Sequence, residues 1–314
     1  MTEVLITAPC SDEIKLRLEE FKNSCIFSFG DRKNDIGSAE VVIGEPRTER
    51  IREAKNLKFV QMTWAGADIY TRGGFPQGIK IANASGAFGT IIAEYASGSL
   101  VALDRSFGRY WSNKQAHIWQ KYDHAETISG KTALVLGMGD IGANVARRLK
   151  VFGAAVLGVK RTAVSAVPAD FDEAHTLDAL DALLPRADIV IGCLPNTRET
   201  AGLLTAERLH AMKAGAVLVN VGRGSLAGTD NLVSALQDGH LGGAALDVFE
   251  TEPLPADCPL WDMENVLLTP HIAGPSFGGS ADVQNTIWHI CMDNLERYLT
   301  GNPLKNVVNR SEGY

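Results

Sequence analysis

The chain of 314 residues carries a formal net charge of -7, and 45% of its residues are hydrophobic and 21% charged. This length predicts about two domains, and no apolar stretch approaches the roughly 20 residues that a membrane-spanning helix needs. The acidic balance, without a cluster of Lys and Arg, argues against a nucleic-acid surface and favours a small-molecule partner.

The first 90 residues alternate short apolar runs with polar helical stretches. Such alternation is typical of βαβ units, in which helices cover a mainly parallel sheet. The apolar residues between 86 and 109 recur at helical spacing, which predicts one long helix that connects two domains. Before this helix, strands are predicted at 4–8, 41–44, 57–62 and 79–83, and a helix is predicted at 13–21.

A second series of strands begins at residue 132, after a polar stretch with several aromatic residues. Its six apolar runs fit one doubly wound parallel sheet. The end of the chain has the pattern of an amphipathic helix that stops at Gly301. The six predicted strands are residues 132–136, 155–159, 189–193, 216–220, 243–249 and 266–270.

A G-x-G-x-x-G motif directly follows the strand predicted at 132–136 and opens a helical sequence. In this motif the first glycine makes a tight turn, the second lets the backbone approach a pyrophosphate, and the third lets helix and strand pack closely. Free N–H groups at such a helix start face the phosphates. The predicted dinucleotide site consists of Gly137, Met138, Gly139, Asp140, Ile141 and Gly142.

The residues after the next predicted strand indicate which dinucleotide binds. In NAD sites an acidic residue at this place accepts hydrogen bonds from a ribose 2′-hydroxyl. This chain instead has Lys160, Arg161 and Thr162, two cations and a hydroxyl that suit a 2′-phosphate. NADP(H) is therefore the favoured cofactor. The alternative is a solvent-exposed basic turn that accepts NAD(H) as well.

Unusual polar residues follow three later strands, at the strand ends where open parallel sheets bind ligands. Arg223 can hold a carboxylate with two parallel hydrogen bonds, and His271 can give and take a proton. Glu252 can fix the tautomer of a histidine and stabilise its charged form. Together these three side chains predict the reduction of a keto acid.

These ordered motifs resemble the D-isomer-specific 2-hydroxyacid dehydrogenase family over nearly the whole chain. The resemblance implies an α/β fold with two doubly wound domains. A Rossmann-type dinucleotide-binding domain would span 98–284, and a smaller flavodoxin-like substrate domain would combine 1–97 with 285–314. The segments that carry the resemblance are SGAFGTIIAEY, ISGKTALVLGMGDIG, CLPNTRETAGLL, NVGRGSL, ALDVFETEPLP and TPHIAGPS, in the family's order.

The resemblance also implies a role for each polar residue at the strand ends. His271 would donate a proton to the keto oxygen, Glu252 would hydrogen-bond His271, and Arg223 would bind the substrate carboxylate and carbonyl. Asp247 would contact the nicotinamide carboxamide. The same motifs imply further cofactor-binding residues at Cys193, Leu194, Pro195, Thr200, Val221, Gly222, Ala273 and Gly274.

The substrate side is expected in the first domain. The segment MTWAGAD resembles the family loop whose backbone amides receive the substrate carboxylate, which implies Ala65 and Gly66. Trp64 and Phe88 are candidates for lining the side-chain pocket, although large aromatic residues commonly belong to the core. The chain departs from the family's commonest form at the Trp64 loop and at Lys160-Arg161.

More specialised functions remain open within the family and outside it. A glyoxylate and hydroxypyruvate reductase is one alternative. A phosphoglycerate dehydrogenase is less expected, because no regulatory domain follows Tyr314 and the substrate half has no obvious phosphate-binding cluster. From a different class, a nucleotide-sensing binding protein like the C-terminal binding protein corepressors shares the fold and the catalytic residues.

The scattered cysteines, none in a C-x-x-C pair, and the acidic N-terminus predict a cytoplasmic protein that lacks a secretory signal and a metal site. Members of the family usually dimerise through the cofactor domain, so we expect a homodimer. The stretch 110–122, rich in Trp and polar residues, is the candidate contact arm.

Overall fold

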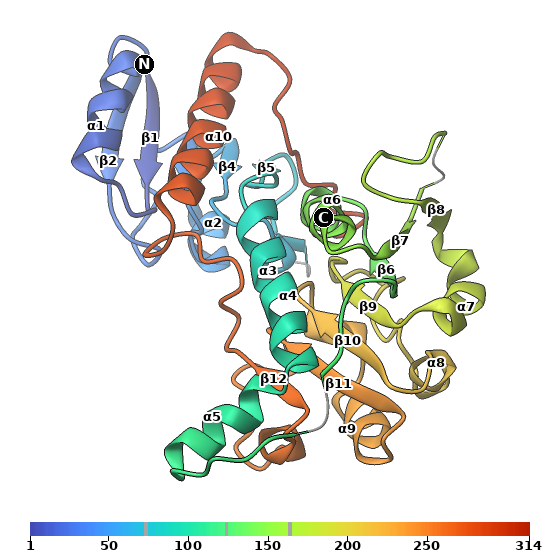
Figure 1. Ribbon diagram of the computed structural model, residues 1–314. Coiled ribbons are helices and arrows are strands. Elements are labelled where there is room, and N and C mark those ends of the chain that lie inside the picture. The colour runs from blue at the N-terminus through green and yellow to red at the C-terminus, as the bar shows by residue number, and fades with distance from the viewer. Residues whose placement is uncertain (72–74, 123–124, 163–164) are drawn as a thin grey trace. The chain divides into compact units, whose positions relative to one another are not determined.

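The computed structural model describes residues 1–71, 75–122, 125–162 and 165–314 (Figure 1). The chain forms two compact units. One unit combines Met1–Phe88 with Pro275–Tyr314, and the other is Gly89–Gly274. The boundaries predicted from the sequence, after 97 and after 284, fall inside helices. Among the described residues no helix is both long and apolar enough to cross a membrane.

The discontinuous unit contains a parallel sheet in the order β2-β1-β3-β4-β5, which is the flavodoxin-like order. Two of its inner strands, β3 and β4, are buried along their whole length, as expected where helices cover both sides. The strands are β1 (Thr2–Ile6), β2 (Cys25–Phe29), β3 (Val41–Ile43), β4 (Phe59–Gln61) and β5 (Lys80–Ala82), and the helices are α1 (Asp12–Leu18), α2 (Thr48–Glu53), α3 (Asp68–Thr71) and α10 (Ala281–Thr300).

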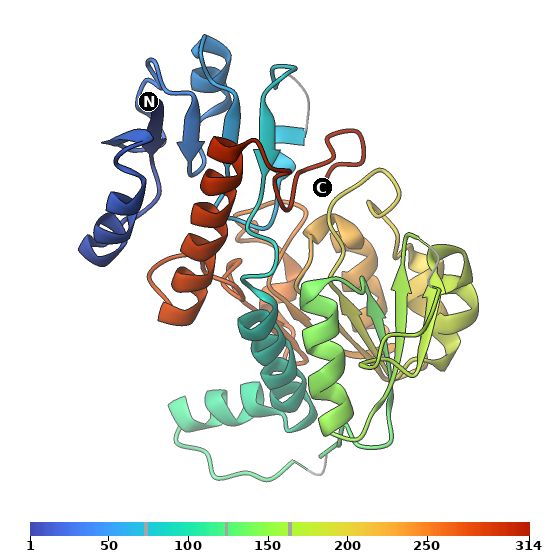
Figure 2. The ribbon, with the colours of Figure 1, turned by 90° about the horizontal axis from the view of Figure 1, so that it is seen from above.

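Helix α10 joins this unit although it lies at the far end of the chain (Figure 2). Trp288 is 2% exposed, and the ring of Tyr298 stacks on Phe59 of β4 with 5.7 Å between the centroids. Gly301 ends the helix in the left-handed region, with φ +74°. Long-range packing therefore makes this unit from two separate segments of the chain.

The second unit contains a parallel sheet in the order β12-β11-β10-β9-β6-β7-β8. This is the Rossmann order with one strand added beyond β11, and the order reverses between β6 and β9. The strands are β6 (Thr132–Leu136), β7 (Ala155–Lys160), β8 (Glu173–Thr176), β9 (Ile189–Gly192), β10 (Ala216–Asn220), β11 (Leu241–Leu246) and β12 (Val266–Leu268), and the helices are α4 (Gly89–Asp104), α5 (Phe107–Gln115), α6 (Asp140–Val151), α7 (Leu180–Leu183), α8 (Ala206–Ala211) and α9 (Thr229–Gln237).

Helices α4 and α6 lie side by side in this unit (Figures 1 and 2). Gly89 permits their approach, because a Cβ there would lie 2.4 Å from the side chains of Asp140 and Asn144. The single helix predicted over 86–109 is instead divided into α4 and α5. Ser106 separates the two helices in the left-handed region, with φ 52°, which a continuous helix does not allow.

Two strands were not predicted from the sequence. Strand β8 has the sequence EAHT and is half-buried along its length, so it lacks an apolar run. Strand β2 lies at the edge of its sheet, and Ile26, Ser28 and Phe29 of this strand are exposed. Its sequence CIFSF is largely apolar, so the hydrophobic pattern is consistent with a strand that the sequence analysis did not assign.

Candidate active site

The candidate site residues of the second unit follow strands that run parallel to one another. The loops after β6, β7, β9, β10, β11 and β12 therefore begin at one edge of the sheet. Ligands of doubly wound sheets bind at this carboxyl edge, near the point where the strand order reverses.

The glycine loop joins β6 to α6 at this reversal point. Gly137 has φ +106°, and a Cβ there would lie 2.9 Å from the carbonyl oxygen of Cys193. A Cβ on Gly142 would lie 1.8 Å from the carbonyl oxygen of Gly137. These two glycines are thus required by the protein's own packing.

Gly139 differs from Gly137 and Gly142 because, apart from the residues next to it in the chain, no described residue has an atom within 4 Å of the place where its Cβ would be. It is the exposed residue that precedes α6, and half-buried Met138, Asp140 and Ile141 flank it. Open space beside a bare backbone at a helix start fits the pyrophosphate of a dinucleotide.

The basic segment after β7 lies beside the glycine loop, because the N–H of Gly137 donates to the carbonyl of Val159 at 2.8 Å. Lys160 is half-buried, while Arg161 and Thr162 are exposed. Three polar residues thus follow β7 at the side of the glycine loop, and their contact with the adenosine ribose stays a prediction.

The loop after β9 borders the glycine loop on its other side. The N–H of Cys193 donates to Leu136 O at 2.8 Å, and a Cβ on Gly222 would meet Leu194 O at 2.7 Å. Burial raises the pKa of the Cys193 thiol to about 12, so this cysteine is neutral and fills space. Thr200 closes the loop by donating its hydroxyl to the carbonyl of Pro195 at 2.5 Å.

His271 and Glu252 form the closest pair among the predicted catalytic residues. The Nδ1 atom of His271 lies 2.9 Å from Glu252 Oε2, while Glu252 Oε1 accepts the N–H of Phe249 at 3.0 Å. Both side chains stay accessible, with 52% of His271 and 38% of Glu252 exposed. Because a carboxylate only accepts hydrogen bonds, this contact favours the tautomer with the proton on Nδ1.

Asp247 holds the turn that carries His271. This carboxylate is 2% exposed; Oδ1 accepts the hydroxyl of Thr269 at 2.6 Å and the N–H of Ile272 at 2.8 Å, and Oδ2 accepts the N–H of Ala273 at 2.9 Å. The N–H of His271 donates to the Asp247 carbonyl at 2.8 Å. These bonds fix a histidine whose φ of 55° is uncommon outside glycine.

Arg223 follows β10, and its backbone is fixed by a buried asparagine. Asn220, 2% exposed, donates its amide to the Arg223 carbonyl at 2.9 Å and accepts the N–H of Gly222 at 3.2 Å. The half-buried Arg223 side chain donates from Nη1 to the Gly222 carbonyl at 2.7 Å. A guanidinium has five N–H donors in a planar fork, which suits a carboxylate.

Gly224 brings the Arg223 loop against the segment that leads to Glu252. A Cβ on Gly224 would lie 1.9 Å from the carbonyl carbon of Phe249, so the two loops touch backbone to backbone. The N–H of Phe249 also donates to Glu252 Oε1, so this contact links the arginine loop to the segment that holds Glu252.

Replacing Gly224 with alanine is expected to lower the free energy of unfolding by about 1–3 kcal/mol and to reduce turnover, because one of the two backbones must shift. Urea unfolding and steady-state rates measure the two effects. Gly98→Ala is the matched control. Residue 98 lies within α4, and apart from the adjacent backbone of this helix no described atom lies within 4 Å of its Cβ position, so the variant should gain about 0.5–1 kcal/mol of stability. Equal stability of the two variants would contradict the contact.

The predicted substrate residues belong to the other unit. Trp64, Ala65 and Gly66 follow β4 and are half-buried, whereas Phe88 is 3% exposed. The Arg32 guanidinium lies over the Trp64 ring, 4.8 Å from its centroid. The structure thus gives Trp64 and its neighbours, rather than Phe88, the accessibility that a ligand requires.

Comparison with known proteins places this geometry in a family. Residues 97–273 match the family model described as D-isomer specific 2-hydroxyacid dehydrogenase, NAD binding domain. The chain belongs to the D-isomer-specific 2-hydroxyacid dehydrogenase family. Characterised relatives are dehydrogenases and reductases, and this chain is an oxidoreductase of the same family.

Two curated relatives illustrate the range of this dehydrogenase family. A glyoxylate reductase of Thermofilum pendens is 33% identical over 82% of this chain and 76% of its own length. A D-3-phosphoglycerate dehydrogenase of Mycobacterium leprae is 33% identical over 84% of this chain. The match covers only 49% of that protein, so this dehydrogenase chain spans about half the length of such relatives.

A solved structure supports the same assignment. The D-isomer specific 2-hydroxyacid dehydrogenase of Xanthobacter autotrophicus, in complex with NADPH and MES, superposes with a TM-score of 0.84 at 29% identity. The superposition covers 100% of this chain and 99% of the other. The fold predicted from the sequence, two parallel α/β sheets with one of Rossmann type, is thereby confirmed.

The sequence analysis missed three residues that support the dehydrogenase site. Asn220 is one; the others are Tyr95 and Thr269, whose hydroxyls lie 2.5 Å apart and extend the chain of bonds to Asp247. Burial raises the pKa of Tyr95, so its hydroxyl stays protonated. A polar residue at the end of an otherwise apolar strand, as in AVLVN, is the signal that could have revealed Asn220.

Proposed function

We propose that this dehydrogenase reduces small 2-keto acids to D-2-hydroxy acids with a reduced nicotinamide cofactor, preferentially NADPH. The observation that carries the proposal is the His271–Glu252 pair at 2.9 Å, at the same sheet edge as Arg223 and the glycine loop. His271 can supply a proton, the Arg223 guanidinium can bind a carboxylate with two hydrogen bonds, and the glycine loop can bind the pyrophosphate of a dinucleotide.

Each predicted catalytic residue has its own role in the proposed reaction. A reduced nicotinamide supplies a hydride to the keto carbon when it is bound. His271 delivers the proton to the keto oxygen from Nε2, while Glu252 stabilises the charged imidazole through Nδ1. Arg223 orients the substrate carboxylate and stabilises negative charge on the keto oxygen. Its fork also selects 2-keto acids over simple ketones.

On the cofactor side, the Gly137–Gly142 loop would hold the pyrophosphate, and the segments around Cys193–Thr200, Val221–Gly222 and Ala273–Gly274 would line the nicotinamide half. The carboxylate of Asp247 already binds its own turn, so any contact with the carboxamide adds to that structural role. Substrate binding is assigned to Trp64, Ala65 and Gly66, and the buried Phe88 is kept as a candidate for lining the side-chain pocket.

NADPH should be used at least about tenfold more efficiently than NADH, because Lys160, Arg161 and Thr162 offer donors and no acidic side chain follows β7 at these positions. The relative from Xanthobacter autotrophicus, solved with NADPH, supports this preference. The measurement is kcat/KM for both cofactors with one keto acid, and Arg161→Asp should shift the ratio towards NADH. A tenfold preference of the wild type for NADH would refute the assignment.

A substrate panel tests the function itself. Glyoxylate and hydroxypyruvate are tested first because a glyoxylate reductase is among the relatives. Pyruvate and phenylpyruvate are tested next, as keto acids with a methyl and an aromatic side chain. Turnover of one of them supports the proposal, and the D product should form from hydroxypyruvate, pyruvate and phenylpyruvate, whose hydroxy acids are chiral. Tight NADPH binding without turnover of any of the four would favour the nucleotide-sensing binding protein.

We also assign the protein to the cytoplasm as a homodimer that associates through the cofactor-binding unit. The dimer is supported by the exposed aromatic surface of α5 and the segment after it, where Trp111 is 62% and Trp119 99% exposed. Part of the predicted contact arm, 110–122, forms α5, and residues 123–124 beyond it lie outside the described ranges. Light scattering at micromolar concentration distinguishes a dimer from a monomer.

A further inference from the structure

The loop after β4 is held from two sides by side chains of its own unit. It comprises Thr63, Trp64, Ala65 and Gly66, here called the amide loop. Thr63 is fully buried, and the next three residues are half-buried. Two side chains outside the loop, Glu45 and Asn83, bind it directly.

Glu45 binds the start of the amide loop. Its Oε1 accepts the Thr63 N–H at 2.6 Å, the Thr63 hydroxyl at 3.0 Å and the Trp64 N–H at 3.2 Å. The side chain is 5% exposed, and its burial raises the pKa of the carboxyl group while the bonds from Thr63 oppose that shift. A buried carboxylate is costly unless it is hydrogen-bonded, and here the amide loop supplies the donors.

Asn83 binds the other end of the loop. Its Nδ2 donates to the carbonyl of Ala65 at 2.7 Å, and the N–H of Ala84 donates to the carbonyl of Trp64 at 2.9 Å. In a planar trans peptide the N–H points away from the preceding C=O. With the carbonyls of Trp64 and Ala65 bound to the segment after β5, the N–H groups of Ala65 and Gly66 point to the opposite side.

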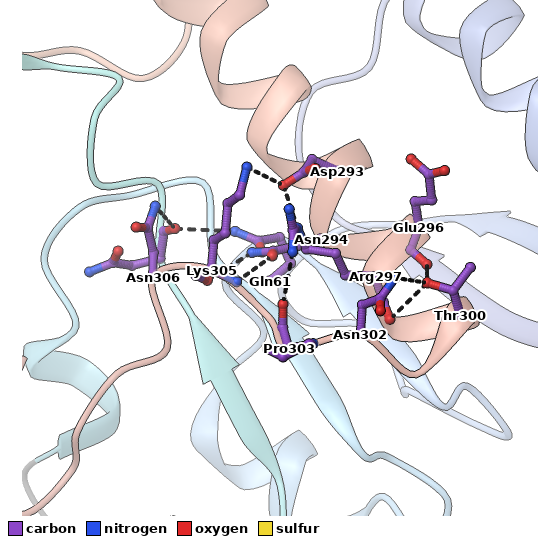
Figure 3. A network of polar contacts seen from close by, with 11 residues as sticks. Gln61, Asp293, Asn294, Glu296, Arg297, Thr300, Asn302, Pro303, Lys305 and Asn306 are labelled. Atoms are coloured by element: carbon purple, nitrogen blue, oxygen red, sulfur yellow. Dashed lines mark hydrogen bonds and ion pairs between the residues drawn. The ribbon is translucent and has the colours of Figure 1, made fainter.

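The position of Asn83 is itself fixed by the C-terminal segment. Its N–H donates to the Asn306 carbonyl at 3.0 Å, and its carbonyl accepts from Gln61 Nε2 at 3.4 Å. Figure 3 shows how Gln61 is bound in turn by Asn294 of α10, at 2.7 Å, beside Lys305. Asn83 thus connects this polar network to the amide loop.

We propose that Glu45 and Asn83 are positioning residues, which set the direction of the Ala65 and Gly66 amides so that both point at the substrate carboxylate. This inference rests on the proposed reduction of 2-keto acids. Glu45 fixes the backbone at the start of the amide loop, and Asn83 fixes the orientation of the peptide group between Ala65 and Gly66. Loss of either side chain lets the N–H groups of Ala65 and Gly66 point in different directions.

The test separates substrate binding from turnover. Asn83→Asp keeps the acceptor that the Ser85 N–H uses at 3.1 Å but removes the donor to Ala65. KM for the keto acid, and Ki for oxamate as its unreactive analogue, should both rise about ten- to hundredfold. The kcat at saturation and the Kd for NADPH should stay within about threefold, because His271 and the glycine loop belong to the other unit.

Glu45 is tested by a graded pair of substitutions. Glu45→Gln keeps an oxygen for the Thr63 N–H and should raise KM several-fold, whereas Glu45→Ala removes all three bonds and should raise it more. The NADPH Kd and the melting temperature verify folding. If the alanine variant fails to fold, Glu45→Gln and Asn83→Asp, which preserve side-chain shape, still decide the matter.

Two matched controls lie in the same unit. Asn302→Asp loses a donor to Thr300 at 3.0 Å, and Glu40→Gln loses the ion pair with Lys58 at 2.5 Å. Neither bond involves the amide loop, so both controls should keep the wild-type KM. Wild-type turnover with unchanged KM and Ki in Asn83→Asp and Glu45→Gln would overturn the positioning role alone. A wild type that turns over no keto acid would overturn the proposed function and this inference together.

Discussion

His271→Ala is expected to lower kcat for keto acid reduction by about 10²–10⁴-fold, the range that general acid catalysis contributes. Nδ1 of this imidazole is bound to Glu252, and we expect Nε2 to donate the proton to the keto oxygen. Alanine also leaves the left-handed backbone at residue 271 less favourable, so stability must be measured beside activity. The Kd for NADPH should change little, since the glycine loop is untouched.

The chain provides a matched control for this substitution. His210 also pairs with a carboxylate, Asp238, at the same distance of 2.9 Å, but this pair lies at the ends of α8 and α9. Its hydrogen bond to Asp238 raises the pKa of His210 above its usual range. His210→Ala should keep wild-type kcat. Near-normal turnover of His271→Ala would refute the role of proton donor.

The fold could largely be predicted from the sequence because buried parallel strands are runs of apolar residues. Strands such as β6 and β10 begin and end at the predicted residues. Strand β8 was missed because its EAHT sequence is stabilised by pairing with β7 and not by its own hydrophobicity. The division at Ser106 was also missed, since one backbone angle leaves no trace in the spacing of apolar residues.

The candidate site, like the fold, could be predicted only in part from the sequence. Motif order was sufficient to predict Arg223, Glu252 and His271, and the structure brings the last two into contact. The groups that hold them were not predicted, because Tyr95 and Thr269 come from distant parts of the sequence and meet only in the folded chain. Glu45 and Asn83 escaped notice for the same reason.

Asp247 shows how a sequence motif can combine two roles. The motif implied a contact with the cofactor, and the structure gives both carboxylate oxygens to the turn that carries His271. A buried acid that accepts several N–H and O–H donors stabilises a turn independently of any ligand. The residue therefore fixes the backbone that carries His271 whether or not it also touches the carboxamide.

Arg223→Lys is expected to reduce kcat/KM for keto acids by about 10²–10³-fold, the loss seen when one donor to a developing oxyanion is removed. Lysine keeps the positive charge but replaces a planar fork with a point charge, so it cannot bind a carboxylate with two parallel bonds. Asn220 and Gly222 hold the backbone of residue 223, and this support does not depend on the side chain. The loss should therefore appear without a change in melting temperature.

Arg208→Lys is the control for Arg223→Lys, because Arg208 also uses its fork, towards Asp181 at 2.7 and 3.2 Å, on the outside of the same unit. It should cost at most about 1 kcal/mol of stability and leave kcat/KM unchanged. If Arg223 acts mainly on the carboxylate, its variant should lose activity towards pyruvate and glyoxylate alike, since both share that group. A uniform loss with unchanged NADPH affinity supports the assignment, whereas a loss confined to NADPH binding would move Arg223 from the substrate to the cofactor.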